Sequence, residues 1–242
     1  MFRKAIPALL AAGLAAGIAS AASAAPGIFF GIDQNPGGTV PPAGNTATAR
    51  ASFLSNLTSV GNEDFESFAI GTTPPLVLSF PGSNGNLTAT LTSTLNVTVT
   101  NQNPVGQYST SGTKHLDAEF GTTLDIDFSA SPISAFGFYG TDISDSGGDL
   151  VVDLVDSMNN MSSITVVVDG QNNGSLLFWG FIDTAATYTS ISLRNTSSSD
   201  RFGFDDMVIG DREQVTLPEA GTLGLLGMSI VALGVAGRRR RS

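Results

Sequence analysis

The sequence predicts an all-β protein, a β-sandwich or jelly roll, preceded by an N-terminal signal helix and followed by a single short transmembrane helix at the C-terminus. Three observations lead to this fold class. One long segment alternates apolar and polar residues, about nine short apolar runs are separated by Gly, Pro, Asn and Ser, and no twelve-residue stretch shows a 3.6-residue period. Short strands at regular spacing are typical of sandwiches and jelly rolls.

The clearest strand signal lies in residues 87–100, "LTATLTSTLNVTVT". Every even position is Thr or Asn, whereas the odd positions are mostly Leu, Val and Ala. Since successive side chains of a strand point to opposite faces, this period of two predicts one buried and one solvated face. The segment is therefore expected to form one long strand, or two strands joined at a bend.

The other expected strands are shorter and follow one another with turn residues between them. They cover residues 76–80, 124–128, 133–140, 150–156, 164–170, 175–182, 188–194 and 202–210. Residues 33–61 are the exception, because a loop rich in Pro and Gly precedes a stretch, residues 47–57, that is expected to form the one short helix.

Both ends of the chain differ from the body. Residues 1–24 contain Arg3 and Lys4, then an apolar run, then the small-residue pattern that ends at Ala24, which predicts a signal peptide cleaved after Ala24. The alternative is a short N-terminal membrane anchor, although the apolar run is shorter than the ~20 residues that a spanning helix needs. Residues 25–214 are then the extracellular β-sandwich domain, and residues 215–242 form a C-terminal tail.

The body is strongly acidic. Between residues 25 and 216 the chain has five basic and twenty acidic residues, a net charge of −15, and the whole sequence has no cysteine. Such a charge disfavours nucleic acid and anionic lipid surfaces as partners, and it suits divalent cations. Without cysteine, disulfides, thiolate nucleophiles and Cys-ligated metals are excluded.

Adjacent carboxylates in "RFGFDDMVIG" predict a cation site. In a regular strand Asp205 and Asp206 point to opposite faces, so at least one of them lies among apolar neighbours. A buried carboxylate needs a partner, and Arg201 is the nearest base in sequence. Because the first and last strands of a jelly roll commonly lie close together, we expect the acidic segment "NEDFESF", with Glu66, to join them. Glu66, Asp205 and Asp206 are thus predicted to hold a structural Ca²⁺ that ties the two ends of the domain together.

Two further groups of residues permit catalytic interpretations. His115 is the only histidine, and a Ser–His–Asp triad would need it, but the chain has no G-x-S-x-G elbow, so His115 is expected to lie at the surface or at a strand end. Asp142, Asp145 and Asp149 share the loop "GTDISDSGGDL", whose spacing does not match the EF-hand calcium loop. These three aspartates are expected to form a solvated turn, and the alternative is a glycosidase-like pair of carboxylates.

The tail "LPEAGTLGLLGMSIVALGVAGRRRRS" has three parts. Pro218 and Glu219 precede an apolar run over residues 223–236, and Arg238, Arg239, Arg240 and Arg241 follow it. Fourteen helical residues span about 21 Å, short of the ~30 Å hydrocarbon core until flanking residues are added. The arginines would hold the C-terminus on the cytoplasmic side, with the body outside.

This tail resembles the PEP-CTERM sorting tail of exported proteins of Gram-negative bacteria, with Ala220 in the motif position that is usually Pro. The resemblance implies an exosortase as partner, which cuts near the motif after transient membrane insertion, and delivery of the body to the cell surface or exterior. It also implies an association with exopolysaccharide and biofilm. The alternative is a lasting membrane anchor that keeps its arginines.

The body resembles the extracellular β-sandwich that accompanies such tails, through "VGNEDFESFAIGT", "AFGFYGTDISDSGGDL", "GSLLFWGFID" and "DRFGFDDMVIGD". The main functional hypothesis is therefore an exported, surface-sorted, non-enzymatic β-sandwich. The "DFE" and "FDD" segments also resemble calcium-stabilised carbohydrate-binding jelly rolls. In that alternative the protein binds an extracellular polysaccharide, and Trp179, Tyr139 and Phe138 are the candidate residues for stacking on sugars. A hydrolase that uses Asp142, Asp145 or Asp149 is a third hypothesis.

Overall fold

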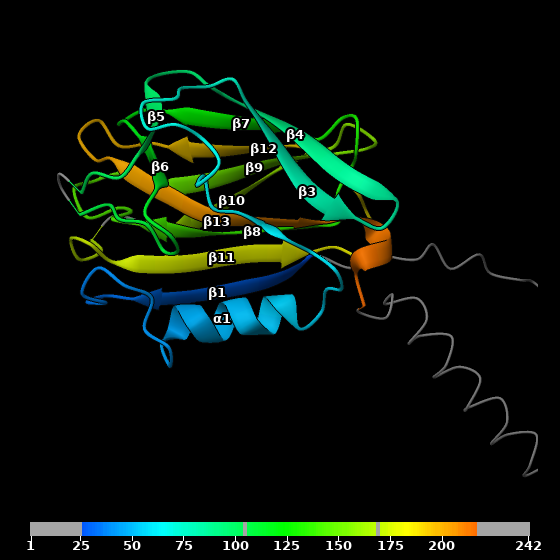
Figure 1. The fold of residues 1–242 in the computed structure, drawn as a ribbon, viewed down its shortest axis with the longest axis horizontal. Helices are drawn as coiled ribbons and strands as arrows, with labels where there is room; N and C mark the ends of the chain where they lie inside the picture. Colours follow the sequence, from blue (N-terminus) through cyan, green and yellow to red (C-terminus); the bar gives the residue numbers. More distant parts are fainter. Residues whose placement is uncertain (1–25, 104–105, 168–169, 217–242) are drawn as a thin grey trace, which may run out of the picture.

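The computed structural model describes residues 26–103, 106–167 and 170–216, which form two antiparallel sheets packed face to face, with one helix outside them (Figure 1). The predicted all-β sandwich is confirmed at this level. The predicted signal segment, residues 1–24, and the tail from residue 217 onward lie outside the described residues. Within the described part of the chain, no helix is long and apolar enough to cross a membrane.

Seven strands form the first sheet, in the order β1-β11-β8-β13-β6-β5, with β2 paired to β13. Their bounds are β1 Gly27–Asp33, β2 Asn62–Glu63, β5 Val97–Thr100, β6 His115–Ala118, β8 Ala135–Thr141, β11 Leu176–Ile182 and β13 Phe202–Gly210. The pairing of β2 with β13 brings the acidic segment that contains Glu63 beside the strand that contains Asp205 and Asp206, as predicted.

Six strands form the second sheet, in the order β10-β9-β12-β7-β4-β3. Their bounds are β3 Leu76–Gly82, β4 Gly85–Ser93, β7 Thr123–Asp127, β9 Leu150–Asp156, β10 Met161–Val167 and β12 Tyr188–Asn195. Most of these strands bury alternate residues, because one face of the sheet packs on the core and the other faces solvent.

The core lies between the sheets and is rich in aromatic residues. Trp179, Phe138 and Phe181 are at most 1% exposed, and their ring centroids lie about 6 Å apart, at 6.0 Å from Trp179 to Phe138 and 5.9 Å from Trp179 to Phe181. Four strands of the seven-stranded sheet, β6, β8, β11 and β13, are buried along their whole length. The near-continuous apolar sequences of β8, β11 and β13 follow from this, since both of their faces are covered.

A second apolar layer covers the outer face of the seven-stranded sheet. It is formed by α1 (Asn45–Leu54), close to the predicted helix, which packs on β1 and β11 (Figure 1). Phe53 of α1 is fully buried and lies 5.6 Å from Phe178, measured between ring centroids. The Asp33 carboxylate at the end of β1 accepts hydrogen bonds from the N–H groups of Asn45 and Thr46, so the strand caps the helix that packs on it.

The predicted long strand over residues 87–100 is two strands that belong to different sheets. β4 ends at Ser93, a turn follows in which Leu95 is half exposed, and β5 begins at Val97 in the opposite sheet. The alternation is kept on both sides of the turn, since Leu91 and Val97 both face the core. The alternative of two strands joined at a bend is therefore correct.

Candidate functional site

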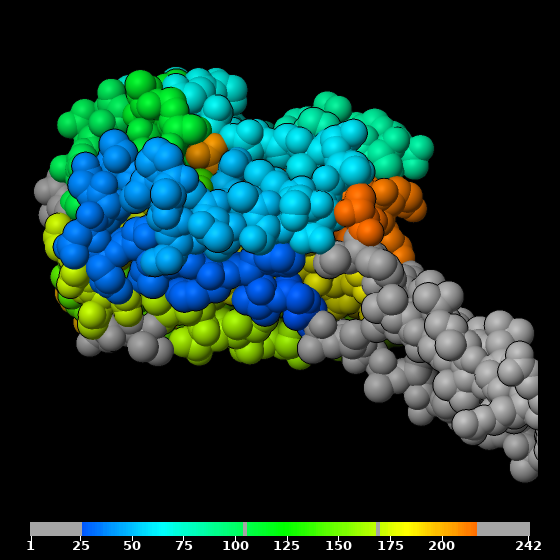
Figure 2. Space-filling view, turned by 90° about the horizontal axis from the view of Figure 1, so that it is seen from below, coloured from blue at the N-terminus to red at the C-terminus, as the bar shows by residue number. Residues whose placement is uncertain are grey.

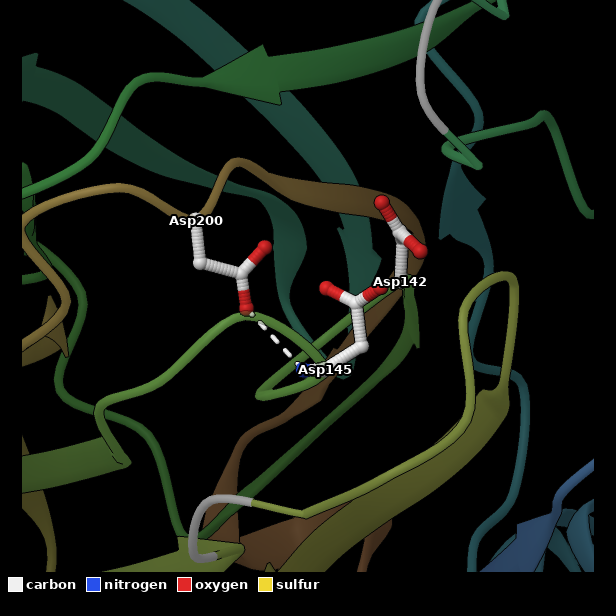
Figure 3. A group of neighbouring side chains, drawn as sticks. All are labelled: Asp142, Asp145 and Asp200. Atoms are coloured by element: carbon white, nitrogen blue, oxygen red, sulfur yellow. Dashed lines mark hydrogen bonds between the residues drawn. The ribbon is translucent and has the colours of Figure 1, made fainter.

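Three aspartates from two loops meet at one end of the sandwich, and we call them the aspartate cluster: Asp142, Asp145 and Asp200 (Figure 3). One carboxylate oxygen from each of them lies within 4.8 Å of the others. Asp142 follows the last residue of β8, Asp145 lies in the β8–β9 loop, and Asp200 lies in the β12–β13 loop. The two loops meet because β8 and β13 are neighbours in the sheet.

The backbone at the cluster is tightly constrained. Asp142 and Ser144 adopt left-handed φ angles of 58° and 65°, which are uncommon for residues other than glycine. The N–H of Asp142 donates to the carbonyl of Ser175, and Asp200 Oδ2 accepts from the N–H of Asp145 at 3.1 Å. Gly148, at φ 81°, lets the two loops touch, since a Cβ there would collide with Ser197.

The cluster lacks a positive side chain. Within the described residues, Arg201 pairs with Asp117 and Glu119 instead, and no lysine or arginine forms an ion pair with the three aspartates. Burial, reinforced by the nearby charge of Asp145, raises the pKa of Asp142 to about 6 and that of Asp200 to about 7. Ionising all three carboxylates therefore costs free energy, which a bound proton or cation would offset.

The chemistry of the cluster fits a calcium ion. Hard cations such as Ca²⁺ take six to eight oxygen ligands, and three carboxylates can supply several of these and balance the charge. Two buried oxygens nearby in the structure have no hydrogen-bond partner among the described residues. They are Ser144 Oγ, between two of the aspartates in sequence, and Oε1 of Gln107, whose Nε2 donates to Asp142 Oδ2 at 3.1 Å. Unsatisfied buried oxygens beside a carboxylate cluster point to a ligand.

The carboxylates that the sequence predicted as calcium ligands accept hydrogen bonds from other residues of the chain. The Asp205 carboxylate accepts hydrogen bonds from the N–H groups of Thr110 and Ser111, and Asp206 accepts from Ser111 Oγ. Glu66 accepts from the N–H groups of Thr113 and Lys114. A Ca²⁺ ion at Glu66, Asp205 and Asp206 stays a prediction.

The local structure at Asp205 and Asp206 differs from the regular strand that was assumed. A β-bulge falls between Asp205 and Val208, and Asp206 has a φ of 49°. The bulge turns the two carboxylates toward the same segment, so that Thr110 Oγ1 donates to both of them. Burial, with the neighbouring charge of Asp206, raises the pKa of Asp205 to about 7.

The other predicted residues are placed as follows. His115 is 1% exposed, neither ring nitrogen has a hydrogen-bond partner among the described residues, and burial lowers the pKa of His115.

Asp149, expected to share a turn with Asp142 and Asp145, is not a member of the aspartate cluster. Asp200, which is 3% exposed, takes its place. The predicted solvated turn is only partly correct, since Asp145 and Asp149 are partly exposed but Asp142 is 1% exposed.

The three candidate stacking residues lie inside the protein. Trp179, Tyr139 and Phe138 are 1%, 4% and 0% exposed, respectively. Trp179 and Phe138 belong to the core between the sheets, and Tyr139 packs under α1. None of the three is exposed enough to stack on a sugar, so the prediction of a stacking role for them is wrong and all three are core residues.

An open depression with a volume of about 660 Å³ lies beside the aspartate cluster, and we call it the amide pocket. Its walls come from three loops and combine amide side chains, glycine backbone and one phenol. The residues that define it here are Asn35, Asn103, Asn173, Tyr108, Gly106 and Gly174.

Asp142 joins the aspartate cluster to the amide pocket. Its Oδ1 accepts from the N–H of Gly174 at 2.6 Å, and its Oδ2 accepts from Gln107, which lies between Gly106 and Tyr108 in sequence. Gly106, at φ 120°, lies flat against the same carboxylate, because a Cβ there would collide with it. The carboxylate of Asp142 therefore positions two of the three loops that form the pocket.

The third loop is tied to its neighbour by side-chain amides. Gln34 Nε2 donates to Gln171 Oε1 at 2.6 Å, and Gln34 Oε1 accepts from the N–H of Asn172 at 3.0 Å. Asn172 Nδ2 also donates to Asn35 Oδ1 at 3.3 Å. The described residues that line the pocket include no carboxylate, so its surface is polar and uncharged.

No protein-family model and no curated protein matches this chain. Solved structures resemble parts of the fold at low identity. The K2 cleaved adhesin domain of Lys-gingipain aligns with a TM-score of 0.41 and 14% identity, over 63% of this chain and 98% of that one. The CBM22-1 xylan-binding domain of Paenibacillus barcinonensis Xyn10C gives 0.34 and 13%, over 57% and 94%. TmCBM61, solved with β-1,4-galactotriose, gives 0.32 and 15%, over 50% and 86%.

Proposed function

We propose that this protein is a non-catalytic, calcium-stabilised β-sandwich that binds carbohydrate in the amide pocket. The observation that carries the proposal is the double role of Asp142, a member of the aspartate cluster whose two carboxylate oxygens also hold both the Gly174 and the Gln107 sides of the pocket. A cation at the cluster would fix this carboxylate and, through it, the walls of the pocket.

The surface chemistry of the pocket suits sugar hydroxyls. An asparagine amide has two N–H donors and an oxygen with two lone pairs. Asn35 Oδ1 and Asn103 Oδ1 each accept one hydrogen bond from the chain, so a second lone pair on each can accept from a sugar hydroxyl, and their N–H groups can donate to one. The pocket is open and lacks charged lining residues, while the whole chain has a net charge of −10. Such a chain repels anionic polymers, so we expect a neutral glycan as ligand.

The same geometry favours binding over hydrolysis. Glycoside hydrolysis needs a carboxylic acid and a second carboxylate on either side of the scissile bond. The three aspartates of the cluster are not among the residues that line the pocket, and Asp142 and Asp200 are buried. Asp142 and Asp145 are therefore assigned to cation binding, and the protein is proposed to have no enzymatic activity.

Glycan binding tests this proposal. In a screen of neutral oligosaccharides followed by calorimetry, the Asn35→Ala/Asn103→Ala double variant is expected to bind the best ligand at least tenfold more weakly, a loss of about 1.4 kcal/mol. Asn86→Ala is the matched control, because this exposed asparagine lies in the β3–β4 hairpin, outside the pocket. Equal affinities for all three proteins, or no binding to any glycan, would contradict the proposal.

We further propose that the protein reaches its site of action through its tail. The observation in favour is the three-part sequence after Leu217, namely Pro218 and Glu219, the apolar run and the four arginines. A short apolar segment before a basic cluster halts export with the preceding body outside the cytoplasm. An exosortase would then release the body to the cell surface, where a polysaccharide ligand is available.

Intact mass spectrometry of the protein from the envelope and medium of its host checks the sorting proposal. The expected mass ends at a residue between Leu217 and Ala220 and begins at Ala25. A mass that retains Arg238 to Arg241 would contradict processing and would make the tail a lasting anchor. This outcome would leave the carbohydrate-binding proposal unaffected.

A further inference from the structure

The free edge of β1 differs from the other three sheet edges. β5 has only four residues, and the N–H and C=O of its Val99 bond to the loop at Thr72 and Gly71. β3 contains Pro81, which has no N–H to donate, and β10 has a bulge between Thr165 and Val167. Short length, proline and bulges are the usual protections of an edge strand. β1 is seven residues long, has no bulge and contains no proline.

The hydrogen-bond pattern of the sheet fixes which groups of β1 face outward. At one end of the β8–β11 pair the N–H of Asp183 donates to the carbonyl of Ser134, and at the other end the N–H of Asp142 donates to the carbonyl of Ser175. Residues 175 and 183 directly flank β11, so the odd-numbered residues of β11 bond to β8. The even-numbered residues of β11 therefore bond to β1, and their partners there are the odd-numbered residues. Consequently Ile28 and Phe30 direct their N–H and C=O groups to the free edge.

The side chains of the same two residues are exposed. Ile28 is 46% exposed and Phe30 45%, on the strand that begins one residue after the described part of the chain starts. Phe30 also lines two grooves, one of about 350 Å³ toward α1 and one of about 250 Å³ toward β10. Much of the surface that includes β1, blue in Figure 2, faces the viewer there.

We propose that this edge pairs with the β1 edge of a second copy of the chain, in an antiparallel arrangement centred on Phe29. The segment "GIFFG" is self-complementary about that residue: Ile28 lies opposite Phe30 of the second copy, and Gly27 lies opposite Gly31. Ile28 and Phe30 then form hydrogen-bonded pairs that use the outward N–H and C=O groups of both chains. Each exposed Ile28 side chain covers an exposed Phe30.

Charge and chain ends are compatible with this partner. The paired segment is uncharged, although the chain has a net charge of −10, and the antiparallel arrangement places the two Asp33 carboxylates at opposite ends of the paired strands. Cleavage after Ala24 would leave two residues before the strand, so little chain would be present to obstruct the second copy. An unprotected edge strand commonly pairs with an extended strand of another chain in this way.

The buried area indicates a weak dimer. A large aromatic side chain buries ~150–250 Å² in full. With about half of each side chain already covered, the four side chains of a symmetric pair add about 400 Å², below the ~1,200 Å² that stable complexes bury. The dimer is therefore expected to be concentration-dependent.

Sedimentation velocity over a wide concentration range tests the pairing on the protein as its host exports it. The parent protein is expected to dimerise, and Phe30→Lys is expected to weaken the dimer at least tenfold. Phe120→Lys is the matched control, because Phe120 has the same residue type and is 46% exposed outside the β1 edge. A parent protein that remains monomeric, or equal effects of the two variants, would overturn the proposal, and monomers would leave the edge to an extended peptide partner.

Disulfide cross-linking tests the register independently, because the chain has no cysteine of its own. Ile28→Cys and Phe30→Cys chains are expected to cross-link when mixed under oxidising conditions, since the two residues lie opposite each other in the pair. Either variant alone places its thiols on diagonal positions, ~7–8 Å apart between Cα atoms, beyond the usual reach of a disulfide. Cross-linking that is no stronger in the mixture than in the separate variants would overturn the register.

Discussion

Adding Ca²⁺ to the EDTA-treated protein at pH 7.5 is expected to raise its melting temperature by roughly 5–10 °C. A ligand at one hundred times its dissociation constant stabilises the folded form by ~2.7 kcal/mol, and each kcal/mol shifts a domain of this size by ~2–4 °C. The physical reason is that Asp142, Asp145 and Asp200 repel one another in the folded state and are separated when the chain unfolds. Differential scanning fluorimetry with and without Ca²⁺ measures the shift.

The Asp200→Asn variant separates cation binding from ordinary stabilisation. Removing one carboxylate relieves the repulsion in the cluster, so the calcium-free variant is expected to melt at the same temperature as the parent or higher. The same change removes a ligand, so the shift on adding Ca²⁺ is expected to disappear. Asp127→Asn is the control, because Asp127 is exposed on the six-stranded sheet and the substitution changes the net charge equally. A full calcium shift in Asp200→Asn would contradict the site.

The calcium shift should also shrink as the pH falls from 7.5 to 5. The raised pKa values of about 6 for Asp142 and about 7 for Asp200 mean that protons occupy the cluster at pH 5. A raised carboxyl pKa stabilises the fold below the ordinary pKa, and this contribution is lost as the pH rises through the raised value. His115, with its lowered pKa, acts in the opposite direction and destabilises the fold below about pH 6.5. Comparing melting temperatures with and without Ca²⁺ at each pH cancels the contributions to stability, such as that of His115, that calcium does not affect.

Local sequence pattern predicted most of the strands but missed β1, β2 and β6, and it did not predict which strands pair. The alternation from Leu87 to Val99 identified the buried residues on both sides of the turn, since Leu91 and Val97 both belong to the core, but not at Leu95, which is half exposed. Residues 87–100 are divided between two sheets by the turn at Leu95. Because Leu95 is an apolar residue at an odd position, it continues the alternation and gives no local signal of a turn. The sequence also did not predict the apolar layer between α1 and the seven-stranded sheet. β1 and β11 carry apolar residues on both faces, and this pattern is the same whether a second sheet or a helix covers a face.

Asp200 could not be assigned to the cluster from the sequence. It lies 55 positions from Asp145, in a separate loop, and it approaches Asp145 only because β13 pairs with β8. The sequence does show that the β8–β9 loop is rich in Asp, Ser and Gly and that three consecutive serines precede Asp200 in the β12–β13 loop. That composition predicts turns in which side chains bond to their own backbone, as the Ser197 hydroxyl does with the N–H of Asp200. Strand order is the missing information, because it determines which loops meet.

Trp179→Ala is expected to lower the free energy of unfolding by about 3–5 kcal/mol, the typical cost of removing a large buried aromatic side chain. Trp179 is 1% exposed between the sheets and packs against Phe138 and Phe181. Chemical denaturation followed by circular dichroism measures the loss, and Phe120→Ala, at an exposed site, is expected to cost less than about 0.5 kcal/mol. Glycan binding by the fraction that remains folded should be unchanged, because Trp179 does not line the amide pocket. A Trp179→Ala protein with parental stability and lost glycan binding would instead restore the stacking role that burial excludes.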